Sequence, residues 1–75
     1  MGIRTSVGRE AGRGEFNGPD DVNLVKQLLN LVYYGAGLIE NGRIDEATIE
    51  RIEQFQASVV GLREPDGYIS PRGRT

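Results

Sequence analysis

The chain has 75 residues, which is the size of one small domain. It contains no cysteine and no histidine, so thiol catalysis, zinc-finger sites and imidazole-dependent triads are excluded. The net charge of -2 argues against a general nucleic-acid binder, and the longest apolar run, residues 31–34, is too short to span a membrane. A small binding or docking module is the class of protein that remains.

The first eighteen residues are expected to form a flexible, Gly-rich arm, separate from a helical domain over residues 19–75. The arm holds five of the 11 glycines of the chain, namely Gly2, Gly8, Gly12, Gly14 and Gly18. Its few sizeable apolar side chains cannot offset the entropy of ordering this segment by themselves. One short extended piece around residues 3–7 is expected to lie on the body of the protein.

The next segment predicts an amphipathic helix over residues 19–34. Pro19 suits the first helical position, and the two aspartates that follow it favour the positive end of the helix dipole. Apolar residues then recur at three- and four-residue steps and form one buried stripe of Val22, Val25, Leu28, Leu29 and Val32. Lys26, Gln27 and Asn30 are assigned mostly to the opposite, solvated side.

A second amphipathic helix is predicted over residues 45–59. Asp45 is a suitable N-cap, with Thr48 three residues later, and Gly61 ends the helix. The stripe expected to be buried consists of Ile44, Thr48, Ile52, Phe55 and Val59. Gln56 is expected to form structural hydrogen bonds near a turn. Two such helices joined by a Gly-rich connection predict an αα-hairpin.

An internal repeat links residues 37–45 with residues 61–70, with one residue inserted in the second copy. Each copy reads Gly-Leu, an acid, Asn-Gly or Asp-Gly, one further residue, an isoleucine and a helix-capping residue. Asn-Gly and Asp-Gly supply the positive φ angles of tight turns. Each isoleucine, Ile44 or Ile69, is therefore expected to point inward at the start of a new helix.

Ser70 and Pro71 predict that a third helix starts near residue 71. Only about one turn of it would precede Thr75, and helices that short do not persist alone. We therefore expect that the natural protein continues beyond this point. The fold class predicted from these elements is all-α, a small three-helix-type bundle whose third helix is truncated.

The two turns also invite comparison with a calcium-binding loop. Aligning Gly42 or Gly67 with position six of an EF-hand loop requires an acid at position one and a bidentate glutamate at position twelve. The residues at these places are Gly37 and Thr48 in the first copy and Leu62 and Gly73 in the second. Both frames fail, so no metal site and no cofactor are predicted.

Taken together, these motifs resemble the bacterial peptidoglycan-binding domain, a three-helix module appended to cell-wall hydrolases. The resemblance covers residues 19–75 and rests on Val22-x-x-Val25-x-x-Leu28-Leu29, Gly37-Leu38, Asn41-Gly42-x-Ile44, Thr48, Phe55-Gln56, Gly61-Leu62 and Asp66-Gly67-x-Ile69. Asn41 and Asp45 depart from the aspartate and glycine usual in the family. The opening Ser6-Val7-Gly8 is similar to a subgroup found in secreted muramidases and type VI secretion effectors.

The resemblance implies a non-catalytic module that binds peptidoglycan, through its glycan or its stem peptide, and targets an attached catalytic domain. It also implies action outside the cytoplasm. Because no apolar signal segment follows Met1, export by a non-Sec route is expected. Flat aromatic groups for sugars and cations for stem-peptide carboxylates are candidate ligand-binding residues: Tyr33, Tyr34, Arg43, Arg63 and Tyr68.

Two other classes of function stay open at the level of sequence. One is a protein-docking module that loads a secreted effector onto its secretion apparatus or binds an immunity protein, through the arm or through an apolar groove. The other is a small glycosidase, for which the 11 carboxylates would supply an acid pair. These acids fall on solvated faces and turns, where their pKa values are rarely tuned, so no catalytic residue is predicted.

Overall fold

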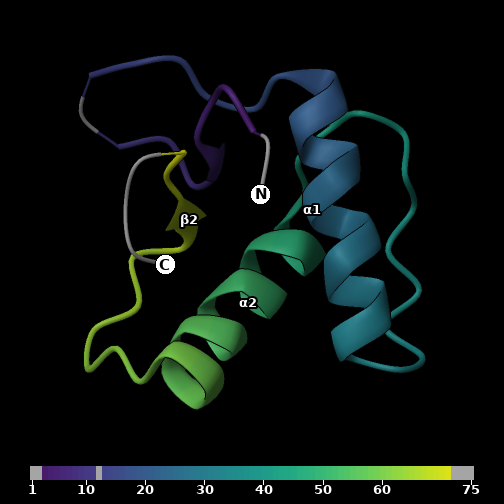
Figure 1. Ribbon diagram of the computed structural model, residues 1–75, viewed down its shortest axis with the longest axis vertical. Helices are drawn as coiled ribbons and strands as arrows, with labels where there is room; N and C mark the ends of the chain where they lie inside the picture. The colour runs from purple at the N-terminus through teal and green to yellow at the C-terminus, as the bar shows by residue number, and fades with distance from the viewer. Residues whose placement is uncertain (1–2, 12, 72–75) are drawn as a thin grey trace.

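A computed structural model of the chain describes residues 3–11 and 13–71. In chain order its elements are β1 (Val7–Gly8), α1 (Pro19–Val32), α2 (Glu46–Phe55), the π-helical turn η1 (Gln56–Val60) and β2 (Tyr68–Ile69). Helix α2 crosses α1, and a long connection leads from the end of one helix to the start of the other (Figure 1). The two short strands lie beside each other; β1 packs against both helices and β2 packs against α2.

The two predicted helices are confirmed, but the all-α prediction is wrong. The protein is a small mixed fold, because β1 and β2 pair in an antiparallel sheet with Val7 opposite Ile69 and Gly8 opposite Tyr68. Ile69 does point into the core as the repeat predicted, but the backbone that carries it is extended and pairs with the N-terminal segment. The third helix predicted near residue 71 lies outside the described residues.

The N-terminal segment, expected as a flexible arm, is packed against the body of the protein. The expected extended piece is present as β1, and the Val7 side chain is 0% exposed. Ile3 is buried in the same core cluster. Asn17, at φ 60°, holds the backbone of Gly8 from both sides, accepting from its N–H at 2.8 Å and donating to its carbonyl at 3.0 Å. Side chain-to-backbone bonds thus supply the order that composition alone did not predict.

Asp21 fastens this segment to the first turn of α1. One of its carboxylate oxygens accepts hydrogen bonds from the Arg4 N–H at 3.1 Å, the Thr5 N–H at 2.8 Å and the Thr5 hydroxyl at 2.7 Å. The Thr5 hydroxyl oxygen accepts in turn from the N–H of Gly18, the residue that caps α1. The Asp21 carboxylate also lies at the positive end of the helix dipole. The hydrogen bonds from residues 4 and 5 and the dipole of α1 therefore stabilise the same negative charge.

The core lies between the helices and the sheet and follows the predicted stripes, except that Leu28 lies outside it and that both stripes stop short of their predicted last residue. Its buried apolar residues are Ile3, Val7, Val22, Val25, Leu29, Leu38, Ile49, Ile52 and Ile69, with Ile44 and Phe55 partly buried against them. Val32 and Val59 were expected to be buried, but they are 51% and 61% exposed. Val59 belongs to η1, whose wider i→i+5 turn shifts the residues after Phe55 out of the 3.6-residue phase.

Candidate functional site

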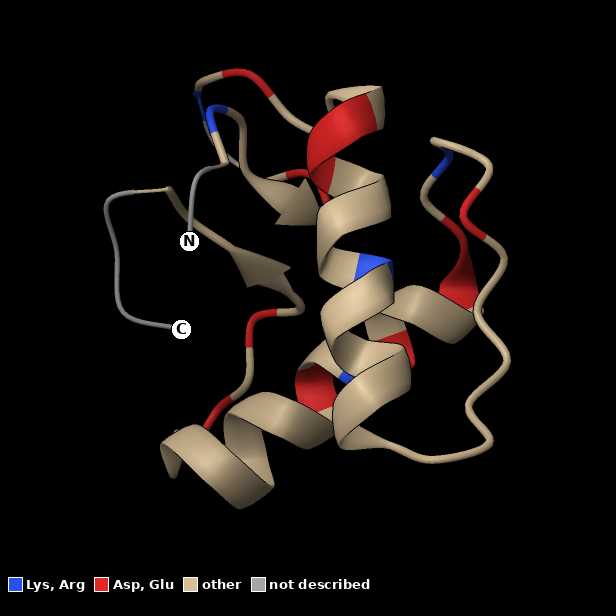
Figure 2. Cartoon of the chain, turned by 45° about the vertical axis from the view of Figure 1, so that its right-hand side comes forward, with Lys and Arg blue, Asp and Glu red and all other residues tan. Residues whose placement is uncertain are grey.

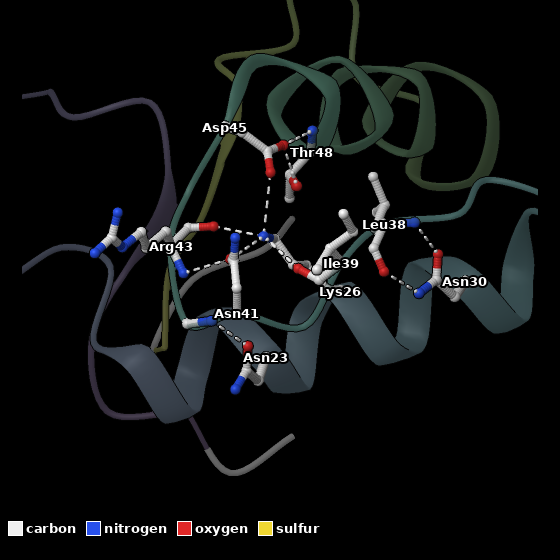
Figure 3. Close-up of polar contacts among 10 residues, drawn as sticks. Asn23, Lys26, Asn30, Leu38, Ile39, Asn41, Arg43, Asp45 and Thr48 are labelled. Atoms are coloured by element: carbon white, nitrogen blue, oxygen red, sulfur yellow. Dashed lines mark hydrogen bonds and ion pairs between the residues drawn. The ribbon is translucent and has the colours of Figure 1, made fainter.

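Lys26 is the most unusual residue of the described structure, because its charged side chain is 0% exposed. Its assignment to the solvated side of the first helix was wrong. The Nζ atom donates to oxygens of four residues of the connection before α2: the Ile39 carbonyl at 2.8 Å, the Asn41 side chain at 3.0 Å, the Arg43 carbonyl at 2.5 Å and the Asp45 carboxylate at 3.1 Å (Figure 3). A buried ammonium is tolerated only with such compensation.

The sequence did contain a signal for this burial. Lys26 lies four residues after Val22 and three before Leu29, so helical periodicity places it on the buried stripe. It is also the single basic residue within α1, whose first turn carries two aspartates (Figure 2). What the sequence did not reveal is the set of oxygens that surrounds the charge, because they come from a loop with no regular periodicity.

Two asparagines of α1 hold the same loop at its other points. The Asn23 side-chain oxygen accepts from the Gly42 N–H at 2.6 Å. Asn30 pairs with the backbone of Leu38, donating to its carbonyl at 2.9 Å and accepting from its N–H at 2.9 Å (Figure 3). Asn23, Lys26 and Asn30 therefore position the loop that carries the Asn41-Gly42 turn, while Gln27 is exposed, as predicted.

Asp45 joins this loop to α2 and acts as its N-cap, as predicted. Its Oδ1 atom accepts from the Thr48 N–H at 2.8 Å and from the Thr48 hydroxyl at 2.7 Å, while Oδ2 accepts from Lys26. Burial works to raise the pKa of Asp45, but the hydrogen bonds from Thr48 and the nearby Lys26 ammonium outweigh it and lower the pKa below its ordinary value. The carboxylate is therefore held ionised at neutral pH.

The second turn is closed in the same manner by Gln56, whose predicted structural role is confirmed. The side chain is fully buried; its Nε2 donates to Asp66 Oδ1 at 2.7 Å and to the Tyr68 carbonyl at 2.8 Å. Its Oε1 accepts from the Gly67 N–H at 3.0 Å. Both copies of the repeat are thus fixed by a polar side chain from the preceding helical segment.

The five candidate ligand-binding residues lie in different places. Tyr34, Arg43 and Arg63 are exposed, Tyr33 lies beneath the Arg51 guanidinium at 5.5 Å, and Tyr68 meets the Phe16 ring edge-on at 5.6 Å between centroids. No hydrogen bond, ion pair or ring contact joins any two of the five, all of which lie in the described part of the chain. The Tyr33 hydroxyl is buried and has no hydrogen-bond partner among residues 3–11 and 13–71.

Of these five, Arg43 lines an open cleft on the described surface. The cleft has a volume of about 550 Å³ and lies between the end of β1, the Asn41-Gly42 turn and the start of α2. Two cations and two carboxylates line it, namely Arg9, Arg43, Glu10 and Glu46. Arg9 also lies 3.7 Å from the Glu53 carboxylate, an exposed pair of little energetic weight.

A separate groove of about 160 Å³ lies between the two helices and β2. All of its lining is apolar, consisting of Val25, Leu28, Leu29, Val32, Phe55 and Ile69. The docking hypothesis expected an apolar groove at the place of a third helix, and that helix lies outside the described residues. The groove carries no titratable group, so its chemistry is limited to binding an apolar surface.

Within residues 3–11 and 13–71, no group of three or more acidic side chains is placed to hold a metal ion. In the same residues no helix has both the length and the apolar character needed to cross a membrane. Comparison of the chain with protein-family models, with curated proteins and with solved structures found no match in any of the three.

The carboxylates of Asp21 and Asp45, which hold backbone segments through hydrogen bonds, predict that the protein loses stability in acid. The Thr5 hydroxyl, which outweighs burial, lowers the pKa of Asp21, and the contacts above lower that of Asp45. A lowered folded-state pKa contributes stability above the ordinary value of 3.8 that is lost as the pH falls through the lowered value. The melting temperature should therefore fall as the pH drops below about 5.

The melting temperature of the variant Asp21→Asn should fall less steeply with decreasing pH than that of the wild type, because asparagine does not titrate. The neighbouring Asp20→Asn is the matched control, since Asp20 is exposed and also lies in the first turn of α1. Thermal unfolding by circular dichroism across this pH range checks the prediction. Parallel pH profiles for the wild type and Asp21→Asn would contradict it.

Proposed function

We propose that this chain is a non-catalytic module that binds peptidoglycan and targets an attached catalytic domain of a secreted cell-wall hydrolase or effector. The observation that carries the proposal is the repeat. Both Gly-Leu units lead into a turn with a positive-φ glycine, at 75° and 80°, followed by an isoleucine that packs on the core. The resemblance to the peptidoglycan-binding family rests on these two units and on Phe55-Gln56, whose glutamine closes the second turn.

The cleft beside the first turn is the proposed binding surface. Its arginines, Arg9 and Arg43, suit the carboxylates of a stem peptide, and its glutamates suit an amino group. The cleft residues that the structure describes include no aromatic ring on which a sugar could stack. Among the two expected ligands, this chemistry favours the stem peptide over the glycan.

Sedimentation with purified, insoluble sacculi tests the proposal. The wild-type protein should pellet with the sacculi, and Arg43→Ala should reduce the bound fraction several-fold because one carboxylate contact is lost. Arg13→Ala is the matched control, since Arg13 is exposed and does not line the cleft. A wild-type protein that stays in the supernatant would contradict binding, and release of soluble muropeptides would contradict a non-catalytic role.

The second candidate is a protein-docking module, which loads an effector onto its secretion apparatus or binds a partner such as an immunity protein. The wholly apolar groove between the helices and β2 favours it, because exposed apolar surface of this kind is typical of protein interfaces. A stoichiometric complex with such a component on co-expression, together with no sedimentation on sacculi, distinguishes this function from the first. Both functions agree with action outside the cytoplasm.

A further inference from the structure

The oxygens around Lys26 follow the spacing of a calcium-binding loop. With Gly42 at position six, the four residues that contact Nζ occupy positions three, five, seven and nine: Ile39, Asn41, Arg43 and Asp45. Position seven contributes its backbone carbonyl, as it does in an EF-hand loop. Gly42 has φ 75°, which gives the sharp turn that this position requires. The interior of the loop is therefore arranged around a positive charge.

The second turn repeats this arrangement at equivalent positions. With Gly67 at position six, Gln56 Nε2 binds the side-chain oxygen of position five, Asp66, and the carbonyl of position seven, Tyr68. In both turns the side chain of position five also accepts from the backbone N–H of position seven, at 3.0 Å in the first and 3.2 Å in the second. A nitrogen from the preceding helical segment thus occupies the centre of each loop.

The first loop suits an ammonium better than a calcium ion. Calcium takes six to eight oxygens at about 2.3–2.6 Å. Here four oxygens lie 2.5–3.1 Å from Nζ, which are hydrogen-bond lengths, and Asp45 supplies the single carboxylate. Thr48, at position twelve, donates its hydroxyl proton to Asp45 and offers no bidentate carboxylate. Charge and distance agree with one N–H₃⁺ group, whose three N–H donors serve the four oxygens with one N–H shared between two of them.

We propose that residues 39–45 form a binding site for a primary ammonium ion, which the protein fills with its own Lys26, while Gln56 fills the neutral counterpart in the second turn. The internal ammonium replaces a metal ion as the centre that orders the first turn. The loop that borders the cleft is therefore held in place without calcium. Because Lys26 is the only lysine of the chain, its ammonium can be removed or observed without interference from another.

Chemical rescue tests the proposal. The substitution Lys26→Ala deletes Cγ, Cδ, Cε and Nζ, which together correspond to n-propylammonium. In the presence of n-propylammonium chloride the melting temperature of Lys26→Ala should rise by several degrees, and that of the wild type should not. Sodium chloride at equal ionic strength and n-propanol are the controls for salt and for the apolar chain; neither should rescue.

Equal effects of n-propylammonium on the wild type and Lys26→Ala would overturn the proposal. Stabilisation of Lys26→Ala by calcium chloride but not by n-propylammonium would overturn it as well, since the loop would then be a metal site. A Lys26→Met variant adds a third check, because its thioether chain fills the apolar part of the space and should abolish rescue.

A measurement on the wild type covers the case in which Lys26→Ala does not fold. In protein labelled with ¹⁵N-lysine, the single ammonium should give one signal whose protons exchange with water far more slowly than those of free lysine. The variant Asp45→Asn should speed this exchange, whereas Asp66→Asn, in the second turn, should leave it unchanged. Exchange as fast as in free lysine would overturn the proposal.

Discussion

Replacing Gly8 with alanine is expected to destabilise the protein by an amount comparable to its whole stability. Gly8 has φ +130°, and a Cβ atom there would lie 2.7 Å from Tyr68 Cα and closer still to the Gly67 carbonyl oxygen. Both obstacles are backbone atoms of the paired segment, so no rotamer change relieves the clash. Backbone strain and overpacking each cost about 1–3 kcal/mol, against a total stability of roughly 3–5 kcal/mol for a core of this size.

The matched control is Gly14→Ala. Gly14 also has a positive φ, +118°, but a Cβ atom there meets nothing within 4 Å. The control therefore retains the conformational penalty and removes the clash. Urea unfolding should show a loss for Gly8→Ala that exceeds the control by at least about 2 kcal/mol, or no cooperative transition at all. Equal losses would mean that the close approach of β1 to residues 67–68 does not exist.

This expectation depends on the part of the fold that the sequence did not predict. Periodicity and capping residues located both helices, and the Gly-Leu repeat located both turns and the inward isoleucines. The sheet was not predicted because its two-residue strands, Val7–Gly8 and Tyr68–Ile69, are too short to show an alternating pattern of apolar and polar residues. They are also about 60 residues apart in the chain. Strand pairing over that separation produces no recognisable pattern within either segment of the sequence.

The candidate site was predicted only in part for a related reason. Arg43 was selected because it flanks a turn, and it does line the cleft. Lys26 was missed because its charge was given more weight than its place on the buried stripe. A charge that is surrounded by carbonyl oxygens can be buried, and those oxygens exist only once the loop is folded. Burial of a polar residue is therefore a tertiary property, even when periodicity points to it.

Gln56 allows the same principle to be tested without a charge. We expect Gln56→Met to destabilise the protein by about 2–4 kcal/mol, because three hydrogen bonds are lost and the buried Gly67 N–H is left without an acceptor. Methionine has a similar length and no branch, so the effect reflects hydrogen bonding more than volume. Burial of the thioether offsets a part of the loss.

Gln54→Met is the matched control, since Gln54 belongs to the same helical segment but is exposed, and its side chain accepts a hydrogen bond from Arg51 at 2.9 Å. Its substitution should change stability by no more than about 0.5 kcal/mol. Urea unfolding gives both free energies, and amide hydrogen exchange at Gly67 reports the turn directly. Equal stabilities of the two variants would show that Gln56 does not organise the second turn.

Because β2 follows Gly67 immediately, loss of this turn should also release Val7 from its strand partner. Amide hydrogen exchange should therefore become faster in β1, although β1 is far from Gln56 in sequence.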